Sequence, residues 1–108
     1  MAALTPTNAV TGNAARGEAS EFGGNLKLQI LTATLESASD TITLVLATDK
    51  IRTIRGVFVQ PVSGFDAECA TVQASFSGLV ITLVSKNAAG SASSAWTDTI
   101  VRLLVIGE

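Results

Sequence analysis

The fold class follows from residues 70–83, which read ATVQASFSGLVITL. Small or apolar side chains occupy every second position up to Phe76, the pair Ser77-Gly78 interrupts this pattern, and apolar residues alternate again from Leu79 onward. Alternation with a period of two is typical of a β-strand with one buried face. A short break that contains glycine is typical of a hairpin turn. The segment therefore predicts an antiparallel hairpin.

Runs of the same kind lie N-terminal to this hairpin. In residues 26–35 the apolar side chains begin on one parity and continue on the other, which predicts a β-bulge at Ile30-Leu31. The polar residues 36–40 have the length of a hairpin loop, so we expect residues 26–35 to pair with residues 41–46.

Two other segments, residues 51–59 and 97–106, carry apolar side chains on both parities. This pattern is typical of strands that are covered on both faces, and it places the first of them in the centre of a sheet. Pro61 should end that strand, because proline cannot donate to a β-ladder. The small and polar residues 85–94 predict a long loop.

Together these segments predict an all-β fold. Val, Ile and Thr make up 30 of the 108 residues, and no helical spacer separates the strands. We expect a compact antiparallel β-sandwich, Greek-key or jelly-roll-like, with about six to eight strands; an up-and-down barrel is the main alternative. Residues 26–108 form the body. Residues 1–25, rich in Ala, Thr, Asn and Gly, form an extended N-terminal arm that is either a disordered terminus or a segment that orders against a partner chain.

Composition argues against most chemistry. The chain has no histidine and one cysteine, Cys69, so a zinc site and an internal disulfide are not expected. Asp40, Asp49 and Asp66 fall in loops, where they would bind a cation or, more commonly, form Asx turns. Phosphate-binding glycine loops and nucleophile–base pairs are not recognisable. We therefore expect a non-enzymatic protein without cofactor or metal.

The charged residues argue against two classes of partner. The formal net charge is −2, and the densest cationic spot, Lys50, Arg52 and Arg55, places its two arginines on opposite parities. Nucleic acid is therefore not an expected partner. No apolar run is long enough to span a bilayer, and the N-terminus does not have the pattern of a classical export signal, so we expect neither membrane association nor secretion. Cys69 is expected to be an inert, half-buried thiol or, alternatively, a reactive one.

Charge is scarce: Asp, Glu, Lys and Arg amount to 15% of the chain, whereas soluble surfaces carry roughly 25–35%. A single sandwich covers one face of a strand that is apolar on both faces, and a neighbouring subunit would have to cover the other apolar face. We therefore expect a homo-oligomer or a larger assembly. Trp96 either caps the core or anchors such a contact. The side chains expected at a protein interface are Leu4, Val10, Phe22, Phe65 and Trp96.

The strand sequences also resemble those of a known class of proteins. Residues 26–35 (LKLQILTATL), 39–44 (SDTITL), 51–57 (IRTIRGV) and 99–107 (TIVRLLVIG) are similar in rhythm and composition to small all-β virion proteins of tailed bacteriophages. The resemblance covers roughly residues 22–108, and the capsid decoration or cement proteins are closest in size. It does not extend to the arm.

This resemblance implies a β-rich body that sits on the capsid surface, often as an oligomer, with a terminal arm that ties capsomers together. The implied partners are the major capsid protein and other copies of the chain. The implied location is the capsid surface of a virion, with the chain synthesised in the host cytoplasm, and no catalytic residue is implied. A tail, neck or head-fibre component of the virion is one alternative. A free-standing glycan- or peptide-binding β module is an alternative of another class.

Overall fold

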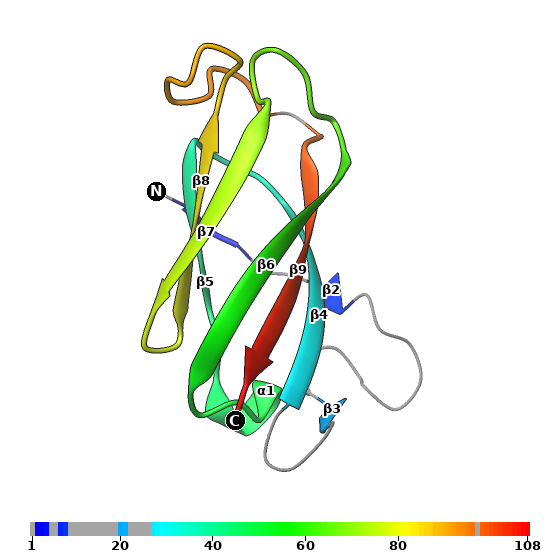
Figure 1. The fold of residues 1–108 in the computed structure, drawn as a ribbon, viewed down its shortest axis with the longest axis vertical. Helices are drawn as coiled ribbons and strands as arrows, with labels where there is room; N and C mark the ends of the chain where they lie inside the picture. The colour runs from blue at the N-terminus through cyan, green and yellow to red at the C-terminus, as the bar shows by residue number, and fades with distance from the viewer. Residues whose placement is uncertain (1, 5–6, 9–19, 22–26, 97) are drawn as a thin grey trace.

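The computed structural model describes residues 2–4, 7–8, 20–21, 27–96 and 98–108, which are mostly β (Figure 1). Six strands form two three-stranded antiparallel sheets. Sheet A consists, in spatial order, of β5 (Ser39–Thr43), β8 (Val80–Lys86) and β7 (Thr71–Ser77). Sheet B consists of β4 (Lys27–Thr34), β9 (Ile100–Gly107) and β6 (Ile54–Ser63).

Three two-residue strands of the N-terminal arm pair with edge strands of these sheets. The first, β1 (Ala2–Ala3), pairs with β5 in parallel, whereas β2 (Thr7–Asn8) and β3 (Ser20–Glu21) pair with β4 in antiparallel orientation. The described pieces of the arm therefore lie along strands of their own chain.

The predicted hairpin in residues 70–83 is confirmed. Strands β7 and β8 pair in antiparallel register from Thr71↔Lys86 to Ser77↔Val80. Gly78 occupies the turn with φ 59°, a left-handed conformation that glycine adopts at little cost. The inward positions of β8, Ile81 and Leu83, are at most 1% exposed.

The hairpin expected between residues 26–35 and 41–46 is wrong. Strand β4 pairs with β9 in sheet B, whereas β5 pairs with β8 in sheet A, so the connection between them crosses from one sheet to the other. Alternation shows that a strand has one buried face but does not specify its hydrogen-bonding partner. Residue 46 is not in a strand either: β5 ends at Thr43, and Leu46–Asp49 forms a single helical turn, α1.

The expected bulge at Ile30-Leu31 is also wrong. All eight residues of β4 pair with β9 in one unbroken register. Leu31 and Ala33 point into the core together with Gln29, while Leu28 and Ile30 lie half-buried on the opposite face. The change of parity in the sequence therefore reflects two partly apolar faces of one regular strand.

Strand β6 lies at the edge of its sheet, contrary to the central position expected for it; the central strand of sheet B is β9. Pro61 does not end β6, which continues to Ser63. Pro61 pairs with Val101 beside a register shift, and an edge strand next to such an irregularity is where proline is tolerated in a sheet.

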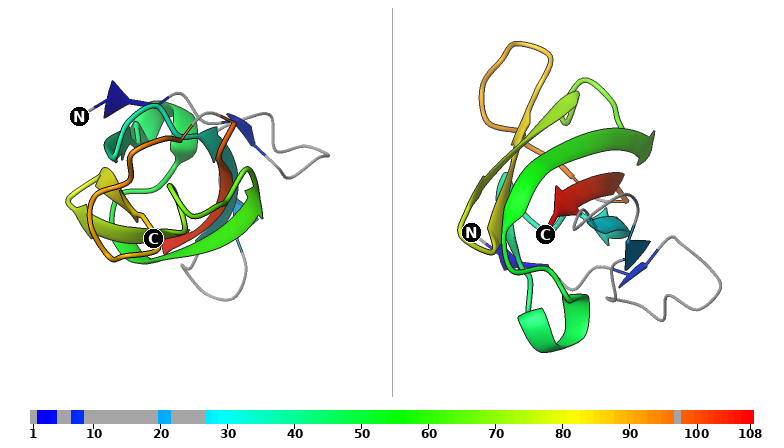
Figure 2. Two further views of the ribbon diagram at one scale, coloured as in Figure 1. Left: turned by 90° about the horizontal axis from the view of Figure 1, so that it is seen from above. Right: turned by 60° about the horizontal axis from the view of Figure 1, so that its bottom comes forward.

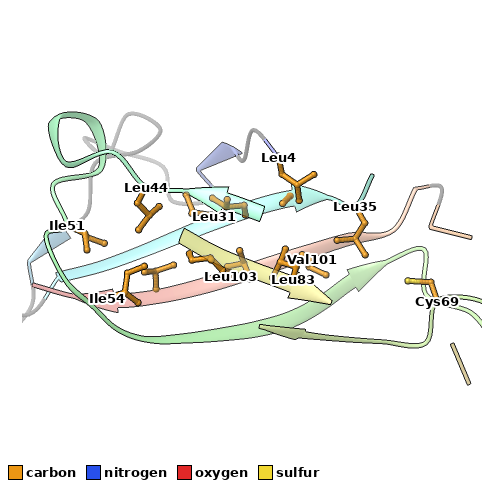
Figure 3. Packing of buried hydrophobic residues seen from close by; sticks show 14 residues of the cluster. Leu4, Leu31, Leu35, Leu44, Ile51, Ile54, Cys69, Leu83, Val101 and Leu103 are labelled. Atoms are coloured by element: carbon orange, nitrogen blue, oxygen red, sulfur yellow. The ribbon is translucent and has the colours of Figure 1, made fainter. Parts of the chain in front are cut away.

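The hydrophobic core lies between the two sheets, and its side chains extend into a shared interior (Figure 3). Seen from above, the strands of both sheets surround this interior (Figure 2). Leu31 and Leu103 represent sheet B, and Ile42 and Ile81 represent sheet A; each is at most 1% exposed. The radius of gyration of 13.8 Å is close to the roughly 13 Å expected for a compact chain of this length.

Candidate functional site

Of the interface residues expected from the sequence, the three that the structure describes are not gathered on one exposed surface. Leu4 is 8% exposed and belongs to the core of its own chain. Phe65 and Trp96 are half-buried and pack against that core from loops at the ends of β6 and before β9. For Trp96 this position favours core capping over an exposed anchor. Val10 and Phe22 lie outside the described residues.

The loops that carry Phe65 and Trp96 meet at one end of the molecule. The Ser94 N–H donates to Glu68 O over 3.1 Å, and the Thr99 hydroxyl donates to Gly64 O over 3.1 Å. These loops are therefore joined by hydrogen bonds between residues far apart in the sequence, and their aromatic side chains serve to close the core at this end.

The three aspartates considered as cation ligands each hold a local turn. Asp40 Oδ2 accepts the backbone N–H groups of Glu36 and Ser37, and Asp66 Oδ1 accepts those of Glu68 and Cys69. Such Asx interactions stabilise a turn without any ion.

Asp49 is 1% exposed; its Oδ2 accepts the Val45 N–H over 2.7 Å, and its Oδ1 accepts the Gln29 amide over 2.9 Å. Within the described part of the chain, no three potential ligands from His, Cys, Asp and Glu lie close enough to hold a metal ion.

The cationic residues are also dispersed. Arg55 forms an ion pair with Glu108, and its Nε donates to Glu108 Oε2 over 2.8 Å. Lys27 Nζ donates to the Lys50 carbonyl over 2.6 Å. Cys69 is fully buried, which favours the inert thiol over the reactive one.

The most distinctive surface of the described residues is the outer face of sheet B. The antiparallel register aligns Ile30, Leu104 and Phe58 in one cross-strand row. The next row contains Leu28 and Ile106 beside Gly56. Leu28, Ile30, Leu104 and Ile106 are half-buried, and the Phe58 side chain is 59% exposed. We call the five side chains of these two rows, together with the depression that adjoins them, the outer apolar face: Leu28, Ile30, Phe58, Leu104 and Ile106.

A depression of about 280 Å³ adjoins the Ile30–Leu104–Phe58 row. Its far side is polar, because the following row aligns Thr32, Arg102 and Gln60. The lining residues come from all three strands of sheet B: Ile30, Phe58, Val59, Gln60, Arg102 and Leu104. The surface thus combines an apolar row with one cationic side chain at its border.

The outer face of sheet A has a different character. The edge strands contribute Ser39, Thr41 and Thr43 of β5 and Gln73, Ser75 and Ser77 of β7, and the central strand β8 contributes Val84, Thr82 and Val80 between them. Thr82 separates the two valines, and hydroxyl or amide side chains that hydrogen-bond with water flank each of them, so the described residues form no contiguous row of large apolar side chains on this face. Only the outer face of sheet B, among the described surfaces of the two sheets, presents rows of large apolar side chains.

The sequence indicated part of this surface. Apolar residues on both parities of residues 51–59 and 97–106 pointed to Phe58 and Leu104. Leu28 and Ile30 were missed as its third strand because their parity was attributed to a bulge. The signal that could have found them is strict alternation with a polar residue at one inward position: Gln29 continues the inward set of Leu31 and Ala33, and it is buried with a hydrogen bond to Asp49.

None of the described helices is long and apolar enough to cross a membrane. No protein-family model matches the chain, and no curated protein or solved structure matches it.

Proposed function

We propose that this protein is a non-enzymatic structural component of a protein assembly, and that it binds its neighbour through the outer apolar face of sheet B. The observation that carries the proposal is the exposure of Phe58 beside the Ile30–Leu104 pair on the outer face of sheet B. Removing apolar surface from water stabilises a contact by roughly 25 cal/mol per Å². Aromatic side chains that fill a neighbouring surface are frequent interface anchors.

The contrast between the two sheets supports this choice of surface. The Ser and Thr side chains on the outer face of sheet A hydrogen-bond readily with water. The two apolar rows of sheet B carry large aliphatic side chains, and a partner that covers them removes these side chains from water. Contiguous apolar patches on small proteins commonly mark protein interfaces. The low charge content of 15% is consistent with a chain whose surface is partly covered in its working state.

We further propose that the assembly is a phage virion, with this chain as a decoration or cement protein on the capsid and a major capsid protein subunit as the occupant of the outer apolar face. The support is the similarity of the strand sequences to small phage virion proteins and the size of the chain. In this role many identical copies would each add a modest contact to the shell, so that the stabilisation accumulates over the lattice.

The same proposal includes the finer description of the fold as a Greek-key β-sandwich with an extended arm. Two facts support it: successive strands β4, β5 and β6 alternate between the sheets, and the core cluster draws on both of them. Pairing of β9 between β4 and β6 brings together strands that are distant in the sequence, as Greek-key connections do.

The test is a matched pair of charge substitutions. Phe58→Asp places a carboxylate in the outer apolar face, while Val80→Asp places one at a 37% exposed position near the hairpin tip of sheet A. We expect the wild-type chain and Val80→Asp to co-sediment with phage capsid shells that lack the protein, and Phe58→Asp to remain in the supernatant with its circular dichroism unchanged.

Three results would contradict parts of this proposal. Equal co-sedimentation of Phe58→Asp and the wild type would exclude the outer apolar face as the binding surface. Copy number in purified virions separates locations: a shell protein occurs at every capsomer, whereas a tail or neck component occurs in few copies. A wild-type chain that stays monomeric in light scattering and binds no shell would favour the free-standing binding module.

A further inference from the structure

The first residues of the chain cross from one sheet to the other. Ala2–Ala3 runs parallel to Asp40–Thr41 of β5, and Thr7–Asn8 runs antiparallel to Leu31–Thr32 of β4. We call β1, Leu4 and β2 the N-terminal plug. It lies where the consecutive strands β4 and β5 part into different sheets (Figure 1).

Leu4 is the residue of the plug that reaches the core. Its backbone N–H donates to Thr41 O over 2.7 Å, and its side chain is 8% exposed. It belongs to the same cluster as Leu31 and Leu35 (Figure 3). The plug thus supplies strand pairing to the edges of both sheets and one apolar side chain to the interior between them.

No local turn ties the plug to the strands it joins. Eighteen residues separate Asn8 from Lys27 at the start of β4, and the parallel partner β5 is more distant still. A hairpin partner is held in place by a turn of a few residues, whereas a long connection contributes little beyond its closure entropy. The interactions of the plug therefore do not depend on which copy of the chain provides it.

The connection is also long enough to reach a second copy. Residues 9–19, between β2 and β3, are 11 residues, and an extended chain spans at most about 3.3–3.6 Å per residue, so they cover up to roughly 40 Å. The longest dimension of the molecule is 42 Å. A plug can therefore reach the corresponding site of a copy that lies alongside, while β3 keeps its pairing with β4.

We propose that the N-terminal plug is exchanged between copies: Ala2–Ala3, Leu4 and Thr7–Asn8 of one chain insert between β4 and β5 of a second copy and place Leu4 in its core. The strand pairing and the burial of Leu4 that are given up within one chain form again between two chains, which makes such swapping a low-cost route to association. Copies held side by side in an assembly raise the effective concentration of the neighbour's plug. The exchange uses a different surface from the outer apolar face and does not require it.

Disulfide trapping between differently tagged chains tests the exchange. Ala3 and Thr41 are directly opposite each other in the parallel ladder, and neither is buried. One chain carries Ala3→Cys and the other Thr41→Cys, both with Cys69→Ala, which removes the natural thiol. The two chains are mixed in denaturant, refolded together and oxidised. The matched control replaces Thr41→Cys by Ser77→Cys, which puts the thiol at an exposed position of β7.

We expect a shift from the mass of one chain to that of two, with a disulfide between positions 3 and 41 identified by peptide mapping, in clear excess over the control pair. A yield no higher than that of the control overturns the exchange. A chain that carries both Ala3→Cys and Thr41→Cys verifies that the two positions can form a disulfide, as an internal or an intermolecular link.

Two further variants separate this inference from the proposed function. Leu4→Asp in the chain that carries Ala3→Cys should reduce the disulfide-linked product, because a carboxylate cannot enter the core without a large desolvation cost. Phe58→Asp should leave the product unchanged. Loss of the product with Phe58→Asp but not with Leu4→Asp would show that the outer apolar face, not the plug, joins the copies.

Discussion

The side-chain amide of Gln29 donates to Asp49 Oδ1 over 2.9 Å, and both side chains are at most 1% exposed. Gln29 occupies an inward position on β4, beside Val105, and Asp49 ends α1. Because Asp49 also accepts the Val45 N–H, one buried carboxylate links the helical turn, the chain that enters it and the interior face of sheet B.

We predict that Asp49→Ala lowers the free energy of unfolding by about 2–4 kcal/mol, since it removes the hydrogen bonds that the buried carboxylate accepts from Gln29 and Val45. Asp49→Asn, which retains one acceptor oxygen, should cost less. Urea titrations followed by circular dichroism measure both. In a double-mutant cycle with Gln29→Leu the effects should be non-additive; strict additivity would show that the Gln29–Asp49 hydrogen bond carries no energy.

Gly64 and Gly78 form a second matched comparison. Both have positive φ, 78° and 59° respectively. A Cβ at Gly64 would overlap the Asp98 carbonyl oxygen, whereas one at Gly78 would have nothing within 4 Å. Gly78→Ala should therefore cost only the roughly 1–2 kcal/mol of the left-handed conformation. Gly64→Ala should cost clearly more, measured by the same titration; equal losses would contradict the close approach of Gly64 to Asp98.

Adjacent leucines on β9 test the difference between the two faces of sheet B. Leu103 points inward and is 0% exposed, whereas Leu104 is half-buried on the outer apolar face. Leu103→Ala should destabilise the isolated chain by about 2–5 kcal/mol, and Leu104→Ala by about 1 kcal/mol. If the outer face binds a shell, Leu104→Ala should weaken shell binding more than it weakens folding. The reverse order of stabilities would invalidate the assignment of the two faces.

The Arg55–Glu108 ion pair should contribute little to stability. Its side chains are 58% and 37% exposed, and exposed pairs typically contribute about 0–1 kcal/mol because water and salt screen them. Arg55→Ala should thus change the thermal midpoint only slightly, and raising the salt concentration should reduce the difference further. A large, salt-independent loss would indicate that Arg55 stabilises β6 by another route.

The local strand pattern was predictable, and strand partners were not. Alternation in residues 70–83 predicted β7 and β8 correctly, because these two strands pair with each other and are joined by a two-residue turn. The same reasoning failed for β4 and β5, whose faces are also alternating but pack across the core from different sheets. Position within a sheet was equally hidden: apolar side chains on both parities suggested a central position for β6, which lies at the edge of sheet B, whereas β9 is the central strand.

The candidate site was only partly accessible from sequence. Apolar side chains on both parities revealed that some strand faces lacked a covering layer, but the cross-strand row of Ile30, Leu104 and Phe58 exists only through the register of three strands. The burial of Leu4 in the core of its own chain was likewise not predictable, because an isolated leucine in a glycine- and alanine-rich arm belongs to no periodic pattern of apolar residues.

The amino-acid sequence by itself determined that this chain is built from short β-strands, that a tight turn lies at Gly78, within one residue of its expected place, and that charged residues are scarce. Those properties are local or additive, so neighbouring residues and composition reveal them. Tertiary structure decided which strands pair, which apolar rows face outward, and where Leu4 is buried. These depend on hydrogen bonds and packing between segments that are far apart in the chain, and the period of a strand carries no information about its distant partner.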